Sequence, residues 1–403
     1  MKRGIILLLI IIMLLVNSGC SNHIELNKLG IISAIAFDLD ERNQWVLTFQ
    51  IIIPKSTSAK TGGGSQSPVT VFSTKGKTVL EAIQKSDLES PRHLFFSHTQ
   101  IIIISERVAE FGISQILDAY LRSYESRETA NVLISDVDAK NVLGILAPLE
   151  NNPGTAISNL LSGQGGKQTN IIQSKLHDLI STMTNPSASA TLPEIKISGK
   201  TEGQNSLDAL KQTQNYASLT LDRVGVFKRD KFAGWLSRKE SLGIPWITDQ
   251  LKRTTIVFSC EGESGSEQLS SFLVEKSHTK LRPNISNGNL FMNVEIEANG
   301  NLIETACDLD LKKSKTLKKL EKHIQEQIKN DVDYSFQALK KMKADALGFG
   351  DAFHKSYPQE WKKLSKNWEN EFKEIRMDVK VNVTIRRTGM IDDSFSKISG
   401  KKE

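Results

Sequence analysis

Short runs of apolar residues, bounded by Gly, Pro, Asn or Asp, recur along this chain and predict strands. QIIIIS at residues 100–105 contains an unbroken apolar run and suits a central strand that is buried on both faces. MDVKVNVTI at residues 377–385 alternates strictly, which predicts a half-buried strand. Further strands are expected at residues 30–38, 45–54, 69–73, 130–135, 217–227, 231–236, 255–260, 269–276, 290–298 and 302–305.

Apolar residues at spacings of three and four predict helices between these strands. The longest such segment covers residues 315–347, and at about 1.5 Å per residue it would form a helix roughly 50 Å long. Its apolar stripe consists of Leu317, Leu320, Ile324, Ile328, Val332, Phe336, Leu339 and Met342. Shorter helices are expected at residues 77–88, 113–123, 157–161 and 171–183.

Two of the helices carry further expectations about which residues are buried. The segment at 77–88 should turn its apolar residues inward, namely Val79, Leu80, Ile83 and Leu88. A helix after Pro358 carries Trp361 and Trp368 seven residues apart, so both lie on one face. We expect this face to be core, and the alternative is a membrane-interface position, which Trp favours.

The order of the elements predicts a mixed α/β chain in three regions. An N-terminal α/β domain is expected at residues 20–190, a small middle domain at 191–253, a C-terminal α/β domain at 254–394 and a basic tail at 395–403. The stretch NPSASATL at residues 185–192 has the composition of a linker between the first two domains.

Residues 1–19 have the pattern of a lipoprotein signal peptide. A basic start is followed by an apolar run at residues 4–16, which is shorter than the about 20 residues that cross a bilayer. Cleavage is expected between Gly19 and Cys20, with acylation of the Cys20 thiol. Each buried methylene of a lipid chain adds about 0.8 kcal/mol of membrane affinity. Asn17 departs from the usual lipobox, so ordinary cleavage or an uncleaved anchor is the alternative.

Composition and charge refine this picture only slightly. The chain is 39% hydrophobic and 24% charged, as globular proteins are, and its formal net charge is +6. A mildly basic protein suits the surface of an anionic membrane and gives no reason to expect nucleic acid as a partner. Cys260 and Cys307 are expected to be buried free thiols, and a disulfide between them is the alternative that an extracytoplasmic compartment permits.

No motif in the chain predicts catalysis. The seven histidines show no H-x-x-x-H spacing, and the cysteines show no C-x-x-C pair. The glycines at residues 163–166 lack the sequence of a phosphate loop, and there is no G-x-S-x-G nucleophile elbow. We therefore expect a protein that is not an enzyme and that uses neither a cofactor nor a metal ion.

One polar segment is a candidate contact surface. Arg122, Glu125 and Arg127 lie within RSYESRE, at spacings that place charges on neighbouring positions of a helix. Such charges usually form a solvated helix face. The alternative is a contact with a partner subunit, in which the arginines act as bidentate donors. The lysines between residues 312 and 322 likewise suggest a solvated face, with anionic lipid as the alternative ligand.

Long, ordered blocks of the chain carry a family resemblance. They are PRHLFFSHTQIIIISERVAEFGISQILDAYLRSYESRE at residues 91–128, VGVFKRDKFAGWLSRKESLGIPWI at residues 224–247, and residues 346–389 from ALGFGDAF to VKVNVTIRRTG. With the early hairpin that ends in IIIP, they resemble the Ger(x)C family, the C-subunit lipoproteins of spore germinant receptors.

The resemblance implies a fold, a place in the cell and partners. The fold would be mixed α+β, with three domains that each contain a mostly antiparallel or mixed sheet with flanking helices, and with the long helix in the C-terminal domain. Cys20 would carry N-palmitoyl and S-diacylglycerol groups on the outer face of the inner spore membrane. The partners would be the integral-membrane A and B receptor subunits, one of which is similar to amino-acid transporters.

The function expected from the resemblance is that of a lipid-anchored, non-catalytic subunit of a nutrient germinant receptor required for spore germination. The alternative is an extracytoplasmic solute-binding lipoprotein that captures the germinant itself. That alternative requires a ligand cleft between domains.

Overall fold

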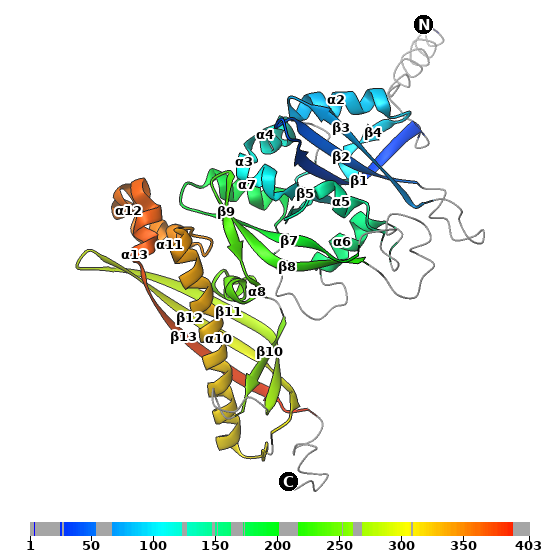
Figure 1. Cartoon of the computed structure of the whole chain (residues 1–403). Helices are drawn as coiled ribbons and strands as arrows, with labels where there is room; N and C mark the ends of the chain where they lie inside the picture. The colour runs from blue at the N-terminus through cyan, green and yellow to red at the C-terminus, as the bar shows by residue number, and fades with distance from the viewer. Residues whose placement is uncertain are drawn as a thin grey trace.

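The computed structural model describes residues 28–53, 67–122, 127–146, 152–162, 174–200, 217–251, 253–260, 268–307 and 309–389, together with residues 4, 25, 150 and 172. Their strands form a nine-stranded sheet from the first part of the chain and a four-stranded sheet from the last part. A long helix, α10, crosses the four-stranded sheet (Figure 1). The expected mixed α+β class and the long C-terminal helix are confirmed.

The first sheet has the strand order β3-β2-β1-β5-β6-β7-β8-β9, and β4 pairs with β1. Neighbours from β1 through β5 and β6 to β7 run parallel, and antiparallel hairpins extend the sheet at both ends. The strands are β1 Leu29–Leu39, β2 Trp45–Ile52, β3 Val69–Gly76, β4 His93–Phe95, β5 Ile101–Ser105, β6 Asn131–Ser135, β7 Ala190–Gly199, β8 Ala217–Lys228 and β9 Lys231–Leu236. Every residue of β5 is buried, which explains its apolar run.

Helices cover both faces of the first sheet. One face packs against a core that includes residues of α2, α3, α4 and α7, and the other against a core that includes residues of α5 and α6. These helices are α2 Val79–Glu89, α3 Glu106–Phe111, α4 Ser114–Arg122, α5 Ala139–Leu143, α6 Pro153–Ser162 and α7 Leu176–Thr184, with a 3-10 turn at Phe96–His98. Buried Gln50 holds α5 and α6 to the sheet, because it donates to the Leu143 carbonyl at 2.8 Å and accepts from the Gly154 N–H at 3.0 Å.

The burial expected for α2 is partly wrong. Leu80 is 60% exposed and Leu88 is 87% exposed, whereas Val79, Ala82 and Ser86 are buried. Residues three and four positions apart share a face of a helix, so the face with Val79, Ala82 and Ser86 and the face with Leu80 and Leu88 cannot both point toward the sheet. The helix buries the first of these faces. The more apolar stripe is therefore not the buried one.

The strands of the expected middle domain lie in the first sheet. Ala190–Gly199 forms β7, which begins within the stretch that resembled a linker, and Ile134 of β6 pairs with Glu194 of β7. β8 and β9 continue the sheet beyond β7. The domain boundaries at residues 190 and 253 stay a prediction, because sheet pairing by itself does not delimit folding units.

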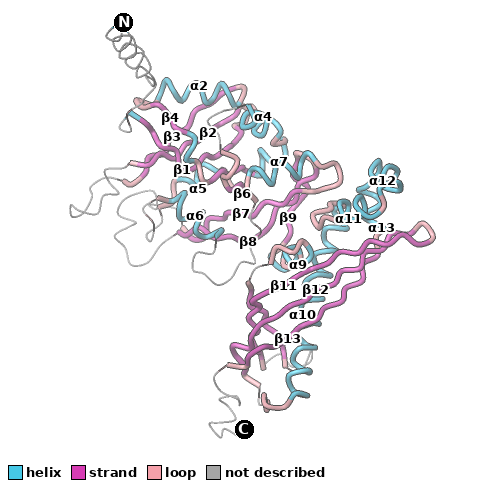
Figure 2. The backbone as a smooth tube through the Cα atoms, turned by 180° about the vertical axis from the view of Figure 1, so that it is seen from behind, coloured by secondary structure: helices cyan, strands magenta, loops and turns pink. Residues whose placement is uncertain are grey.

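The second sheet has the order β10-β11-β12-β13, in which β13 is parallel to β12 and the other pairs are antiparallel. Its strands are β10 Thr254–Ser259, β11 Leu269–Ser286, β12 Asn289–Thr305 and β13 Arg376–Arg387. β11 extends past residue 276, where we expected it to end, and β12 joins two strands that we expected to be separate. The hairpin turns at Asn287 and Gly288, both with positive φ, and its tip lies past the start of β13 (Figure 2).

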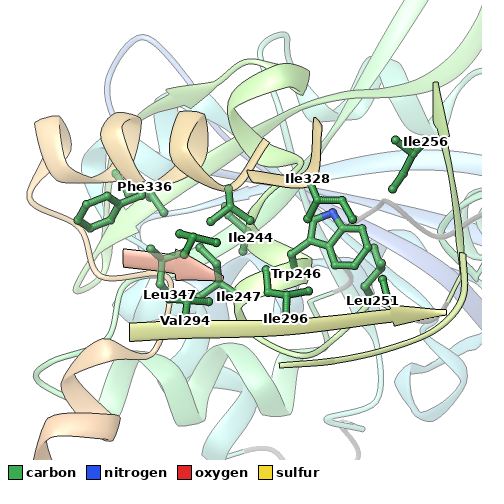
Figure 3. Packing of buried hydrophobic residues seen from close by; sticks show 14 of the residues in the cluster. Ile244, Trp246, Ile247, Leu251, Ile256, Val294, Ile296, Ile328, Phe336 and Leu347 are labelled. Atoms are coloured by element: carbon green, nitrogen blue, oxygen red, sulfur yellow. The ribbon is translucent and has the colours of Figure 1, made fainter. Parts of the chain in front are cut away.

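The face of the second sheet that lies under α10 is filled by one core. α10 spans Ser314–Met342, and its expected stripe is confirmed, with Leu320, Ile324, Ile328, Val332, Phe336 and Leu339 buried. Two short helices, α8 Arg238–Ser241 and α9 Ile244–Ile247, pack against α10. Figure 3 shows Trp246 and Ile247 between Ile328 of α10 and the β12 residues Val294 and Ile296.

The last helices close one end of this core with aromatic side chains. They are α11 Phe349–Ser356, α12 Pro358–Leu364 and α13 Trp368–Glu374, with a 3-10 turn at Ser365–Asn367. The ring centroids of Trp361 and Trp368 lie 4.9 Å apart, and these side chains are only 8% and 3% exposed. The expectation that they belong to the core is confirmed.

Cys260 and Cys307 form a disulfide, with Cα atoms 6.4 Å apart, so the expectation of two free thiols is wrong. The physical reason is the strand order. β10 and β12 both flank β11, and the two cysteines follow the ends of these strands on either side of Ser270. The sequence reveals neither pairing, so it leaves their separation open.

The two sheets are joined through a shared core. Val224 and Val226 of β8 and Leu236 of β9 belong to the same apolar cluster as α10 and the second sheet. Across the junction, the Ser189 N–H donates to the Asp345 carbonyl at 2.9 Å. Among the described residues, no helix is long and apolar enough to cross a membrane.

Candidate functional site

The structure describes only part of the segment that we singled out from the sequence. Arg122, in the last turn of α4, forms an ion pair with Asp118 one helical turn earlier, with its Nε 2.9 Å from an Asp118 oxygen. Arg127 is exposed just before β6. Glu125 lies outside the described residues. The Arg122 pair is what a solvated helix face would show.

Gly19 and Cys20, the expected cleavage and acylation residues, also lie outside the described residues, as do the signal peptide at 1–19, the glycines at 163–166 and the tail at 395–403. Their roles stay predictions.

A cavity with a volume of about 810 Å³ lies over the first sheet. Its floor is made by apolar residues of β1 and β2, namely Ile35, Phe37, Leu47 and Phe49. α2 and α4 form its walls, and the segment from β4 to Phe96 closes one end. Sequence reasoning missed this cavity, because it exists only where two helices that are distant along the chain stand apart over the same strands.

Polar side chains contribute to this cavity in two ways. Gln115, Asp118 and Arg122 line it from α4, and the Gln115 amide oxygen accepts a hydrogen bond from the Trp45 indole at 3.0 Å. Tyr120 also lines the cavity, and its hydroxyl is buried without a hydrogen-bond partner among the described residues. Burial raises the pKa of this hydroxyl, so it remains a neutral donor.

A second polar constellation lies on the first sheet around Arg223 of β8. Its side chain donates to Glu194 of β7, with Nε at 2.9 Å, and to Asp136 at 2.8 Å. The guanidinium also lies 4.3 Å from the centroid of the Trp235 ring. Glu194 has no exposed surface. Burial acts to raise the pKa of Glu194, but the hydrogen bonds from Arg223 outweigh it and hold the pKa below its usual value.

The second half of the chain holds two further buried carboxyl groups. Asp345 accepts hydrogen bonds from the Gly350 N–H at 2.6 Å and the Trp368 indole at 3.0 Å, and burial raises its pKa to about 6. Asp331 of α10 accepts from the Gln327 amide at 2.9 Å, and burial raises its pKa to about 6 as well. Asp331 lines a cavity of about 220 Å³ next to β10.

These carboxyl groups have structural partners, and the described residues contain no cluster of three or more His, Cys, Asp or Glu side chains that could hold a metal ion. Asp345 caps the start of α11 and supports Trp368, while Glu194 and Arg223 neutralise each other. The arrangement provides structural support and an apolar cavity.

Comparison with known proteins gives matches along the chain. A family model described as "Spore germination protein N-terminal domain" matches residues 22–197, and one described as "Spore germination B3/ GerAC like, C-terminal" matches residues 222–389. Spore germination protein KC of Bacillus subtilis (strain 168) is 28% identical over 96% of this chain and 97% of its own length. Spore germination protein A3 of the same organism is 26% identical over 96% and 98%.

A solved structure, the crystal structure of the GerBC protein, superposes with a TM-score of 0.56 at 17% sequence identity, and the match covers 87% of this chain and 96% of the other. At this identity the likeness concerns the fold. It extends over both sheets, so the observed architecture is not peculiar to this sequence.

Proposed function

The chain belongs to the Ger(x)C family of spore germination receptor subunits, and from this premise we propose that it acts in germination as a lipid-anchored, non-catalytic subunit of a nutrient germinant receptor. The observation that carries the proposal is the pair of family matches, one over residues 22–197 and one over 222–389. Together they account for both sheets.

We place the lipid anchor on Cys20. β1 begins at Leu29, so eight residues separate the acylated residue from the first strand of the body. A tether of this length extends at most about 30 Å. It would keep the first sheet close to the bilayer and at a high effective concentration near membrane partners.

A non-catalytic role is supported by the state of the buried acids. Asp345, Glu194 and Asp38 each accept hydrogen bonds from neighbouring backbone or side-chain donors that belong to the fold. A catalytic acid or base needs a free path to a substrate proton. These three groups are used instead to hold elements together.

We propose that the partners are the integral-membrane A and B receptor subunits and that the protein lies on the outer face of the inner spore membrane. The subunit would couple to a ligand-driven change in the membrane subunits by binding one of their conformations better than the other. Arg122, Glu125 and Arg127 remain candidates for this contact, since Arg122 and Arg127 are exposed.

Fractionation of spores tests the anchor. Cys20→Ala removes the only atom that can carry the diacylglycerol, so we expect a variant that is lost from the inner-membrane fraction and a strong loss of nutrient-triggered germination. Ser21→Ala, at the neighbouring position, is the matched control and should behave as wild type. A Cys20→Ala protein that stays in the membrane fraction and supports full germination would refute the lipid anchor.

The alternative, direct capture of the germinant, makes a different prediction for calorimetry. The 810 Å³ cavity has an apolar floor and lies within the first part of the fold, whereas direct capture of the germinant requires a ligand cleft between domains. We therefore expect no heat of binding when amino acids, sugars or nucleosides are titrated into the purified chain. Micromolar binding of one of them would favour the alternative.

A further inference from the structure

We propose that the cavity between α2, α4 and the first sheet binds one neutral ligand with an aliphatic body. Its volume of about 810 Å³ lies within the range of about 300–1,000 Å³ that small-molecule sites occupy. The proposal concerns a binding site that the family role does not include.

The lining of the cavity selects an apolar body. The floor from β1 and β2 is formed by Ile, Leu and Phe side chains, and Val79, Ile83 and Ala119 line it from the two helices. When an aliphatic ligand binds, the apolar surfaces of both the cavity and the ligand are removed from water. This contributes about 25 cal/mol of binding free energy for each Å² of apolar area buried. Leu80 is 60% exposed and also lines the cavity, so a bound chain would cover it.

The charges of the lining residues select a neutral head. Arg122 is already paired with Asp118, and Asp87 adds a second carboxylate on the α2 side. A ligand carboxylate would meet these two acidic residues with no second arginine or lysine among the described lining residues to balance it. Glycerol esters therefore fit better than free fatty acids.

A neutral glyceride could come from the membrane or from the lipid on Cys20. The position of the start of β1 bears on the second source. Leu29 and Gly30 pair with His93 and Leu94 of β4, and the latter two line the cavity. The chain that precedes Leu29 therefore leaves the body beside the site. If Cys20 is acylated, as the proposed function requires, its own glyceride is within reach, and free membrane glycerides are the other source.

Ligand binding is tested with the chain from residue 20 to 403, prepared without lipid. The neutral fluorescent probe N-phenyl-1-naphthylamine should bind at one site per chain and be displaced by 1-monolauroylglycerol. Leu80→Asp places a charge at the mouth and should weaken binding about tenfold or more. Leu88→Asp, on the same helix but outside the lining, is the matched control and should bind as wild type.

Sodium dodecanoate should displace the probe more weakly than the glyceride does. Absence of saturable probe binding, or equal binding by Leu80→Asp and Leu88→Asp, would overturn the proposal.

The source is distinguished by modifying Cys20, which is the only cysteine outside the disulfide. Alkylation with N-dodecylmaleimide should block the probe site if the tethered chain folds back into the cavity, and N-ethylmaleimide is the control. If the dodecyl adduct still binds the probe, the site is open to free glycerides. Failure of the anchor in spores would leave these binding measurements unaffected, so the two proposals fail separately.

Discussion

Arg223 and Glu194 form the most strongly buried ion pair described in the first sheet, and the pair shows how much one residue depends on another. Glu194 has no exposed surface, so its charge is tolerated because Arg223 donates to both of its oxygens. Breaking such a pair from one side leaves an unpaired buried charge.

Arg223→Met should therefore destabilise the chain by roughly 2–4 kcal/mol, at the lower end of the range for buried pairs because the Arg223 side chain is 30% exposed. Adding Glu194→Gln should restore part of the loss, since the orphaned charge disappears. Urea denaturation measures both. Arg122→Met removes an exposed pair and serves as the control, with no expected change in midpoint. An equal loss in the single and double variants would contradict this account.

Asp331 should make stability depend on pH. Burial raises its pKa to about 6 from an ordinary value of 3.8, while its hydrogen bond from Gln327 and the charge of Lys239 oppose the rise. Between these two values the folded chain holds a proton that the unfolded chain has lost. The contribution of Asp331 is therefore most favourable below pH 3.8, declines as the pH rises to about 6, and is constant above that.

Asp331→Asn should remove that decline and raise the free energy of unfolding at pH 7 by about 1–3 kcal/mol. Denaturation of both proteins at pH 4.5 and pH 7 gives the comparison. Asp345 titrates in the same direction in both proteins, so it cancels in the difference. A difference between variant and wild type that is the same at both pH values would show that the carboxyl group does not titrate as described.

At the residue level, acylation of Cys20 depends on a local pattern that the sequence displays, and it stays a prediction. The Arg223–Glu194 pair and the Tyr120 cavity could not be predicted. The members of the pair stand 29 residues apart on neighbouring strands. Their contact depends on strand register, and no local pattern in the sequence specifies that register.

At the scale of elements, long periodic segments were predicted well and short ones less well. The eight-residue stripe of α10 has one solution, and the structure adopts it with its ends partly exposed. In α2 two faces carry apolar residues, and which of them is buried depends on how the helix packs on the strands beneath it. The length of β11 was underestimated, although Asn287-Gly288 is a strong turn signal, because the outer half of β11 is largely polar and exposed.

The turn between α8 and α9 fits against α10 only because residue 243 is glycine. A Cβ atom there would lie 2.4 Å from the Asp331 carbonyl oxygen, and the Gly243 N–H donates to the Ser335 hydroxyl at 2.8 Å. Gly243→Ala should lower the free energy of unfolding by about 1–3 kcal/mol, because α9 must move away from the long helix.

Gly144→Ala is the matched control for this prediction. Its φ is −80°, and the nearest atom to an added Cβ lies 3.6 Å away, so the change should be neutral or stabilise the chain by about 0.4–1 kcal/mol. Thermal unfolding of the two variants distinguishes them. Equal melting temperatures would mean that the α9–α10 contact is looser than described.

At the scale of the whole molecule, the disulfide holds the far end of the second sheet. It closes a loop with a sequence separation of 47 residues that contains the whole of β11 and β12. Cys260→Ser combined with Cys307→Ser should cost about 4 kcal/mol if loop entropy dominates. Denaturation of wild type with and without reductant should reproduce this loss, and unchanged stability on reduction would contradict it.

The boundaries between domains are the part of the whole-molecule organisation that the sequence indicates least clearly. The stretch at residues 185–192 resembled a linker, but its last three residues begin β7. Strands that are adjacent in a sheet need not be adjacent in the sequence, so composition alone did not reveal that β7 continues the sheet from β6. β8 and β9 then contribute to the core of the second sheet, which couples the two halves mechanically.

That shared core suits the proposed role, since a body with one continuous core could transmit a displacement from the first sheet to the second. The account depends on the body being held at the membrane by lipid. Mass spectrometry of the N-terminal peptide from spore inner membranes is the most direct test. We predict a peptide that begins at Cys20 and carries a diacylglycerol thioether and an amide-linked acyl chain, whereas an unmodified Cys20 or an intact residue 1–19 segment in that fraction would contradict the account.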